Sequence, residues 1–99
     1  MKDAKILLVD DDPEVFDLLG GLLAGEGYEV RWAPSAEDFR REALENTPHL
    51  IVLDIMLGEV NGPETYTHIL SLGLDRSIPV IFLSGLVDTD TYTAPVNLP

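Results

Sequence analysis

Short apolar runs alternate with longer amphipathic stretches along this chain, and the alternation predicts the order of its elements. Four strands are predicted, at residues 5–9, 28–32, 50–53 and 79–83. The first and third are continuously apolar after their first residues, as expected of central strands that are covered on both faces. Amphipathic stretches lie between the strands, which is typical of βαβ units that build a parallel sheet. The pattern therefore indicates an α/β fold.

Helix signals separate the predicted strands. Asp12 followed by Pro13 is typical of an N-cap and first helical residue, and Gly25 and Gly27 end that helix. Ser35 with Asp38 resembles a capping box that opens a second helix reaching about residue 46. Pro63 opens a third helix that closes near Gly73. Spacing predicts the inward faces of the three helices in turn: Val15, Leu18, Leu19, Leu22 and Leu23; Ala36, Phe39 and Ala43; Tyr66, Ile69 and Leu70.

Length and composition limit the possible functions. Ninety-nine residues suffice for one domain, so we expect residues 1–99 to form a single unit. The net charge of −12 opposes direct binding to nucleic acid, whose affinity depends on basic side chains. No apolar run approaches the length of a membrane span, and the amino-terminal residues resemble no secretory signal, so a cytoplasmic location is expected. The lack of cysteine excludes disulfides and thiolate metal sites.

Polar side chains follow three of the predicted strands where each strand ends. Asp10 and Asp11 follow the first strand, Asp54 ends the third, and Ser84 ends the fourth. Carboxyl ends of parallel strands share one edge of a sheet, so these groups should converge there. Clustered carboxylates repel one another unless a cation compensates, and oxygen-only ligands suit Mg²⁺. A carboxylate can also attack phosphorus to give an acyl phosphate, for which a hydroxyl would stabilise the transferring oxygens.

Three segments resemble the response-regulator receiver family of two-component signalling: 6–13 (ILLVDDDP), 53–62 (LDIMLGEVNG) and 79–85 (PVIFLSG). The resemblance implies a doubly wound, flavodoxin-like or CheY-like parallel sheet that receives phosphate from a histidine kinase or phosphotransfer protein. It also implies site roles. Asp54 would be the phosphoacceptor, Asp11 a direct Mg²⁺ ligand, Asp10 a ligand through water, the Met56 carbonyl a third ligand, and Ser84 a contact to a phosphoryl oxygen.

The chain departs from the family pattern at its end. Receivers carry a lysine after a fifth strand, beyond the point where this chain stops at Pro99, so a C-terminally truncated receiver is expected. The expected strand order is 2-1-3-4, with the fifth strand and last helix missing. Without that lysine, phosphorylation should be slow and poorly coupled to a switch. Within the site loop, Gly58 stands where the family usually has Pro, and Asn61 where it often has Asp.

Two other functions remain open from the sequence. A receiver-like interaction module that no longer transfers phosphate would fit the missing lysine. A haloacid-dehalogenase-type phosphatase would use Asp10, Asp12 and Ser84, but Asp12 is better explained as a helix cap, and we expect no enzyme beyond self-catalysed phosphotransfer. His49 and His68 are expected to be surface residues. A bare fourth strand would also favour a homodimer or higher oligomer, through strand-four edges or exchanged carboxyl-terminal segments.

Overall fold

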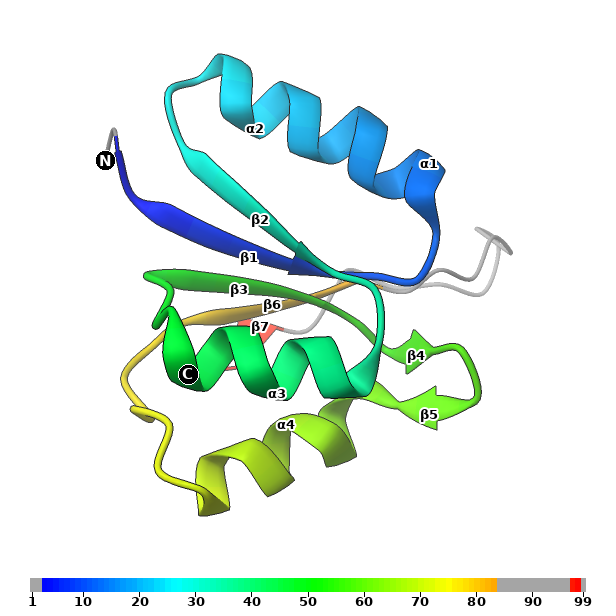
Figure 1. Ribbon diagram of the computed structural model, residues 1–99, viewed down its shortest axis with the longest axis vertical. Coiled ribbons are helices and arrows are strands. Elements are labelled where there is room, and N and C mark those ends of the chain that lie inside the picture. The colour runs from blue at the N-terminus through cyan, green and yellow to red at the C-terminus, as the bar shows by residue number, and fades with distance from the viewer. Residues whose placement is uncertain (1–2, 84–96, 99) are drawn as a thin grey trace.

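The centre of the molecule is a twisted sheet with helices on both faces (Figure 1). The computed structural model describes residues 3–83 and 97–98. The sheet has the order β2-β1-β3-β6-β7, and its first four strands run parallel. Its strands are β1 (Lys5–Val9), β2 (Glu29–Ala33), β3 (Leu50–Asp54), β6 (Val80–Leu83) and β7 (Asn97–Leu98). The parallel order confirms the predicted α/β fold and the arrangement 2-1-3-4.

The central strands are apolar because both of their faces are covered. Positions 6–9 of β1 and 51–54 of β3 are all buried, and the two strands pair in register from Ile6 with Leu50 to Val9 with Leu53. Alternating side chains of these strands enter two separate clusters, one on each face of the sheet. The larger cluster, which includes Leu7 and Ile51, lies under two helices. The smaller cluster, which includes Ile6 and Val52, lies under a single helical segment, so this face of the sheet is less completely covered.

A single helical rod covers the smaller cluster, and it is formed by α1 (Pro13–Val15), the π-helical turn η1 (Phe16–Gly20) and α2 (Gly21–Gly25). Its inward residues are Phe16, Leu19 and Leu23. The predicted face was wrong in part, because Leu18 is 70% exposed and Leu22 is 63% exposed. Phe16, Leu19 and Leu23 lie at i, i+3 and i+7, so the buried stripe is narrower than the five predicted positions, and Leu18 and Leu22 lie on its exposed flank.

The opposite face is covered by α3 (Ala36–Glu45) and α4 (Gly62–Ser71), which lie side by side over the larger cluster (Figure 1). The predicted cap of α3 is confirmed, since the amide of Asp38 donates to Ser35 Oγ at 3.1 Å. Phe39 and Ala43 are buried from α3, and Tyr66 and Ile69 from α4, as their spacing predicted. The described part of the chain contains no helix that is both long enough and apolar enough to cross a membrane.

Between β3 and α4 the chain forms a small antiparallel hairpin, β4 (Met56–Leu57) and β5 (Val60–Asn61), where a loop was predicted. Gly58 takes a φ of +66° in its turn, a conformation that side chains other than glycine rarely adopt. Gly62 follows the hairpin and packs directly on the end of β3. A Cβ atom at Gly62 would lie 2.1 Å from the main-chain oxygen of Asp54, so only glycine permits this approach.

The edge of β6 is not bare, which corrects the prediction that no further strand exists. The two-residue strand β7 pairs antiparallel with β6, aligning Val80 with Leu98 and Ile81 with Asn97. An unpaired strand edge accepts any extended backbone, so this pairing leaves no trace in side-chain periodicity. Self-association through the fourth strand stays a prediction, and the bare-edge argument for it no longer applies at these two positions. Residues 84–96 lie outside the described ranges, so the expected lack of a fifth parallel strand and of a last helix stays a prediction.

The close approach of Gly62 predicts a large effect of one methyl group. Gly62→Ala should lower the free energy of unfolding by at least about 2 kcal/mol, because the clash is with backbone rather than with a flexible side chain. Gly21→Ala is the matched control: Gly21 is helical with no heavy atom near its Cβ position, and the same change should raise the free energy by about 0.5–1 kcal/mol. Urea unfolding of both variants measures these free energies, and equal effects of the two substitutions would contradict the prediction.

Candidate functional site

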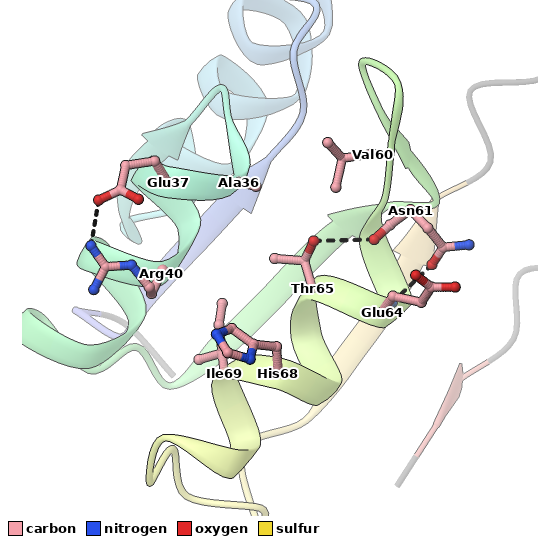
Figure 2. A pocket seen from close by; sticks show the side chains of 9 residues that line it. All are labelled: Ala36, Glu37, Arg40, Val60, Asn61, Glu64, Thr65, His68 and Ile69. Atoms are coloured by element: carbon pink, nitrogen blue, oxygen red, sulfur yellow. Dashed lines mark hydrogen bonds and ion pairs between the residues drawn. The ribbon is translucent and has the colours of Figure 1, made fainter.

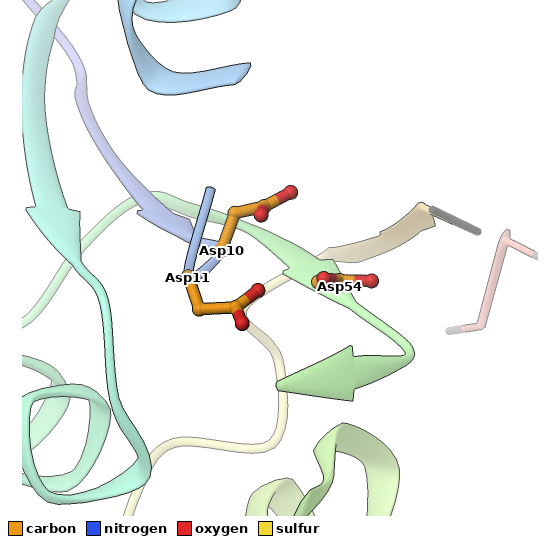
Figure 3. Close-up of side chains that lie close together, drawn as sticks. All are labelled: Asp10, Asp11 and Asp54. Carbon is orange, nitrogen blue, oxygen red and sulfur yellow. The ribbon is translucent and has the colours of Figure 1, made fainter. Parts of the chain in front are cut away.

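Three carboxylates meet at the carboxyl edge of the sheet (Figure 3). Asp10 follows β1 and Asp54 ends β3; because Val9 is aligned with Leu53, these two acids emerge side by side. Asp11 is the next residue in the turn towards α1. One oxygen from each of the three lies within 4.8 Å of the others. The predicted convergence of Asp10, Asp11 and Asp54 is therefore what the fold produces.

Two of the three acids are buried and anchored by main-chain amides. Asp10 is 4% exposed and Asp54 is 5% exposed, whereas Asp11 lies at the surface. Asp10 Oδ1 accepts a hydrogen bond from the amide of Asp12 at 2.9 Å, and Asp54 Oδ1 accepts one from the amide of Met56 at 3.2 Å. These bonds fix the direction of both carboxylates without neutralising either.

The cluster is electrostatically strained when no cation is bound. Burial, followed by the nearby charge of Asp10, raises the pKa of Asp54 from 3.8 to about 6, against the opposing effect of the Met56 amide. Burial is also the largest cause of the raised pKa of Asp10. Among residues 3–83 and 97–98, no Lys, Arg or His forms an ion pair with any of these carboxylates. A cation would thus relieve a cost that the described residues leave uncompensated.

The donor set fits a hard divalent cation such as Mg²⁺. All the side-chain ligands are carboxylate oxygens, with no sulfur or imidazole in the group, and Asp11 is open to solvent, which leaves room for water or a phosphate oxygen. Met56 lies beside the group, since its amide binds Asp54, and its carbonyl as a ligand stays a prediction. Ser84, the predicted hydroxyl donor, lies outside the described residues.

The remaining sequence candidates have structural roles. Asp12 is the N-cap of α1, accepting the Glu14 amide at 2.9 Å, as predicted. His49 and His68 are both exposed. His49 Nδ1 accepts the Lys5 amide at 2.8 Å at the start of β1, and this end of the strand is the one farther from the acids. His68 belongs to α4.

One residue beside the site carries no signal in the motif pattern. The Nε1–H of Trp32, near the end of β2, donates to the main-chain oxygen of Asp10 at 2.7 Å. Trp32 was predicted only as a strand residue, because periodicity assigns it a face of the sheet and says nothing about a hydrogen bond to a neighbouring strand. The available signal was a single tryptophan near the end of a strand that was expected to neighbour the strand preceding Asp10.

A groove of about 460 Å³ lies elsewhere, between α3 and α4 (Figure 2). Its walls carry the Glu37–Arg40 ion pair on one side and Glu64 and His68 on the other, over an apolar floor that includes Ile69. None of its lining residues belongs to the acidic group. Its charges are mixed and do not converge on one point, so the carboxylate cluster remains the better candidate for chemistry.

Comparisons with known proteins agree with this geometry. Residues 6–97 match the family model described as the response regulator receiver domain. The chain is 38% identical over 91 residues to the uncharacterized transcriptional regulatory protein YbdJ of Bacillus subtilis, covering 92% of this chain and 39% of that protein. It is 32% identical over 85 residues to the DNA-binding response regulator MtrA of Mycolicibacterium smegmatis, covering 86% and 36%. The chain thus spans well under half the length of these curated relatives.

Solved structures show the same likeness. The chain resembles a CheY-like response regulator receiver domain protein from Methanospirillum hungatei with a TM-score of 0.77 at 27% identity, covering 90% of this chain and 70% of that one. It resembles a putative response regulator from Chloroflexus aurantiacus with a TM-score of 0.77 at 30% identity, covering 90% and 73%. Both likenesses extend over nearly all of the chain.

The raised pKa of Asp54 predicts a pH-dependent effect of its removal. The folded state holds this proton more tightly than the unfolded chain, so ionisation above about 6 costs folding free energy that is absent below 3.8. Without divalent cations, Asp54→Asn should raise the free energy of unfolding by about 1–3 kcal/mol at pH 7.5, and the gain should shrink as the pH falls towards 4.

Urea unfolding at several pH values measures this gain. Asp75→Asn is the control with the opposite sign, because hydrogen bonds from Ser77 lower the pKa of Asp75, and this variant should not be more stable at pH 7.5. A gain for Asp54→Asn that is the same at every pH would show that its cause is not the buried charge.

Proposed function

This chain belongs to the response regulator receiver domain family, and from that premise we propose that Asp54 is the phosphoacceptor of a two-component phosphorelay. The observation that carries the proposal is the burial of Asp54 beside Asp10 and Asp11 at the converging ends of β1 and β3. A carboxylate in this position can be reached from the open side of Asp11, while its own strand holds it rigidly. The phosphoryl donor would be a histidine kinase or a phosphotransfer protein.

The residues that would hold Mg²⁺ in this proposal are Asp10, Asp11, Asp54 and the main-chain carbonyl of Met56. Their oxygen chemistry and the raised pKa values of the two buried acids support the assignment. When bound, Mg²⁺ would neutralise charge on the carboxylates and on the transferring phosphoryl oxygens. The same neutralisation would favour the ionised form of Asp54, which is the form that can attack.

In the transfer step, a carboxylate oxygen of Asp54 forms a bond to phosphorus while the bond from phosphorus to the donor's histidine nitrogen breaks. The nitrogen leaves with the electron pair, and the carboxylate becomes an acyl phosphate. The Met56 amide donates to Asp54 Oδ1 and so helps to fix the orientation of the carboxylate that would attack.

The phosphatase alternative gains no support from this arrangement. It needs Asp12 as a site residue, yet Asp12 accepts the Glu14 amide as a helix cap, and it leaves Asp54 without a role. The chain would therefore act as an acceptor that is phosphorylated, not as an enzyme with turnover on free substrates. An interaction module that does not accept phosphate is the alternative that experiment must separate.

We predict Mg²⁺ binding that depends on the carboxylate cluster. Asp11→Asn and Asp54→Asn should each weaken Mg²⁺ binding by at least about tenfold, because each removes one charge from a site held by carboxylates. Asp17→Asn is the matched control, since Asp17 is exposed, lies on the helical rod that follows Asp11 and is outside the cluster. Titration followed by amide chemical shifts measures the affinities. Unchanged binding in both site variants would refute the site.

We also predict that a small phosphodonor labels one residue. Acetyl phosphate or phosphoramidate with Mg²⁺ should give an acid-stable, base-labile adduct on Asp54, located by mass spectrometry after borohydride trapping, and Asp54→Asn should abolish it. Asp12→Asn should still be labelled, because Asp12 caps a helix. Mg²⁺ binding without any adduct would support the interaction module, and turnover of a phosphomonoester would support the phosphatase.

A further inference from the structure

Trp32 reaches from β2 to the residue that begins the acidic cluster. Parallel pairing with β1 aligns Trp32 with Leu8, two residues before Asp10. Its side chain is half-buried on the face covered by the helical rod, and its indole Nε1–H donates to the Asp10 main-chain oxygen at 2.7 Å. This bond is short for an N–H donor, and it places an aromatic ring directly behind the turn that carries Asp10 and Asp11.

The bond to Trp32 completes the anchoring of Asp10. The amide of Asp10 donates to the Ala33 oxygen at 3.2 Å, which is the last rung of the β1–β2 ladder, and Asp10 Oδ1 accepts the Asp12 amide at 2.9 Å. The carbonyl of Asp10 lies past the end of the ladder, because β2 ends at Ala33. The indole N–H donates to this carbonyl where no further amide of β2 follows. The peptide between Asp10 and Asp11 is thereby fixed in orientation.

The indole is itself held in place. It stacks on Phe16, with ring centroids 4.9 Å apart and an angle of 9° between the planes. The Phe16 ring in turn packs on Gly20, where an added Cβ would lie 3.0 Å from it. Phe16 and Gly20 begin and end the π-helical turn η1, an irregular feature that is frequent near functional sites. The turn thus presents a flat aromatic surface on which Trp32 cannot easily rotate.

We propose that Trp32 is a positioning residue for the acidic cluster, which holds the Asp10–Asp11 peptide so that both carboxylates face Asp54. This role rests on the proposed function, since its purpose is to prepare the carboxylates for Mg²⁺. Trp32 would touch neither the cation nor the phosphoryl group. It acts through the carbonyl of Asp10, and Phe16 acts through Trp32.

The test compares Trp32→Phe with Val30→Ala. The first keeps a ring that can stack on Phe16 and removes the N–H donor. The second is on the same strand and face, packs against the same cluster, and makes no described hydrogen bond to the acids. Trp32→Phe should weaken Mg²⁺ binding by about three- to tenfold, the effect of losing one hydrogen bond, and should increase the backbone mobility of Asp11 in cation-free ¹⁵N relaxation. Val30→Ala should change neither, although urea unfolding should show an equal or larger loss of stability.

The outcomes separate this proposal from the proposed function. If the parent chain binds no Mg²⁺ but Trp32→Phe alone mobilises Asp11, the function fails and the positioning role stands. If Asp11 stays as rigid in Trp32→Phe as in the parent, or if Val30→Ala weakens the site equally, the positioning role is refuted. If Trp32→Phe does not fold, hydrogen exchange of the Trp32 indole proton in the parent chain tests the proposal instead. This proton should exchange more slowly than that of a free indole, and exchange at the free rate would overturn the proposal.

Discussion

Mutual repulsion among three carboxylates is the constraint on which the rest of this structure depends. Parallel pairing of β1 with β3 forces Asp10 and Asp54 to emerge together, and the turn towards α1 adds Asp11 within 4.8 Å. Burial then raises the pKa values of the two inner acids, so the fold retains a local charge excess that works against its own stability. Such a cost is characteristic of functional sites, because the relief of repulsion by a bound cation supplies binding free energy to the site.

The scaffold around the cluster is rigid at the points where the carboxylates need direction. Gly62 lets the first turn of α4 pack on the Asp54 carbonyl, and the hairpin between them places the Met56 amide on the Asp54 carboxylate. On the other strand, main-chain and indole donors hold Asp10. Both acids are therefore fixed through neutral N–H groups, which orient a carboxylate and leave its charge available for a cation or for attack on phosphorus.

The two faces of the sheet contribute unequally to this arrangement. Under α3 and α4 the larger cluster includes Phe39 and Ile69, both fully buried, and this side gives the sheet most of its apolar burial. Under the helical rod the smaller cluster leaves Leu18 and Leu22 exposed, yet this is the face that carries the stack of Trp32 on Phe16. Stability and site geometry are thus supplied mainly by opposite faces, so substitutions on each face should affect them differently.

The sequence alone determined the order of the four parallel strands and the helices between them, the caps at Asp12 and Ser35, and the acids that would meet. These follow from apolar periodicity, local hydrogen bonding and the shared edge of parallel strands. Only the tertiary structure decided which side of the first helix faces inward, that β7 pairs with β6, and that Trp32 binds the Asp10 carbonyl. Each of these depends on contacts between segments far apart in the chain. The width of a helix's buried stripe, the pairing of a strand edge and an indole hydrogen bond have no repeating sequence pattern, so the folded chain alone reveals them.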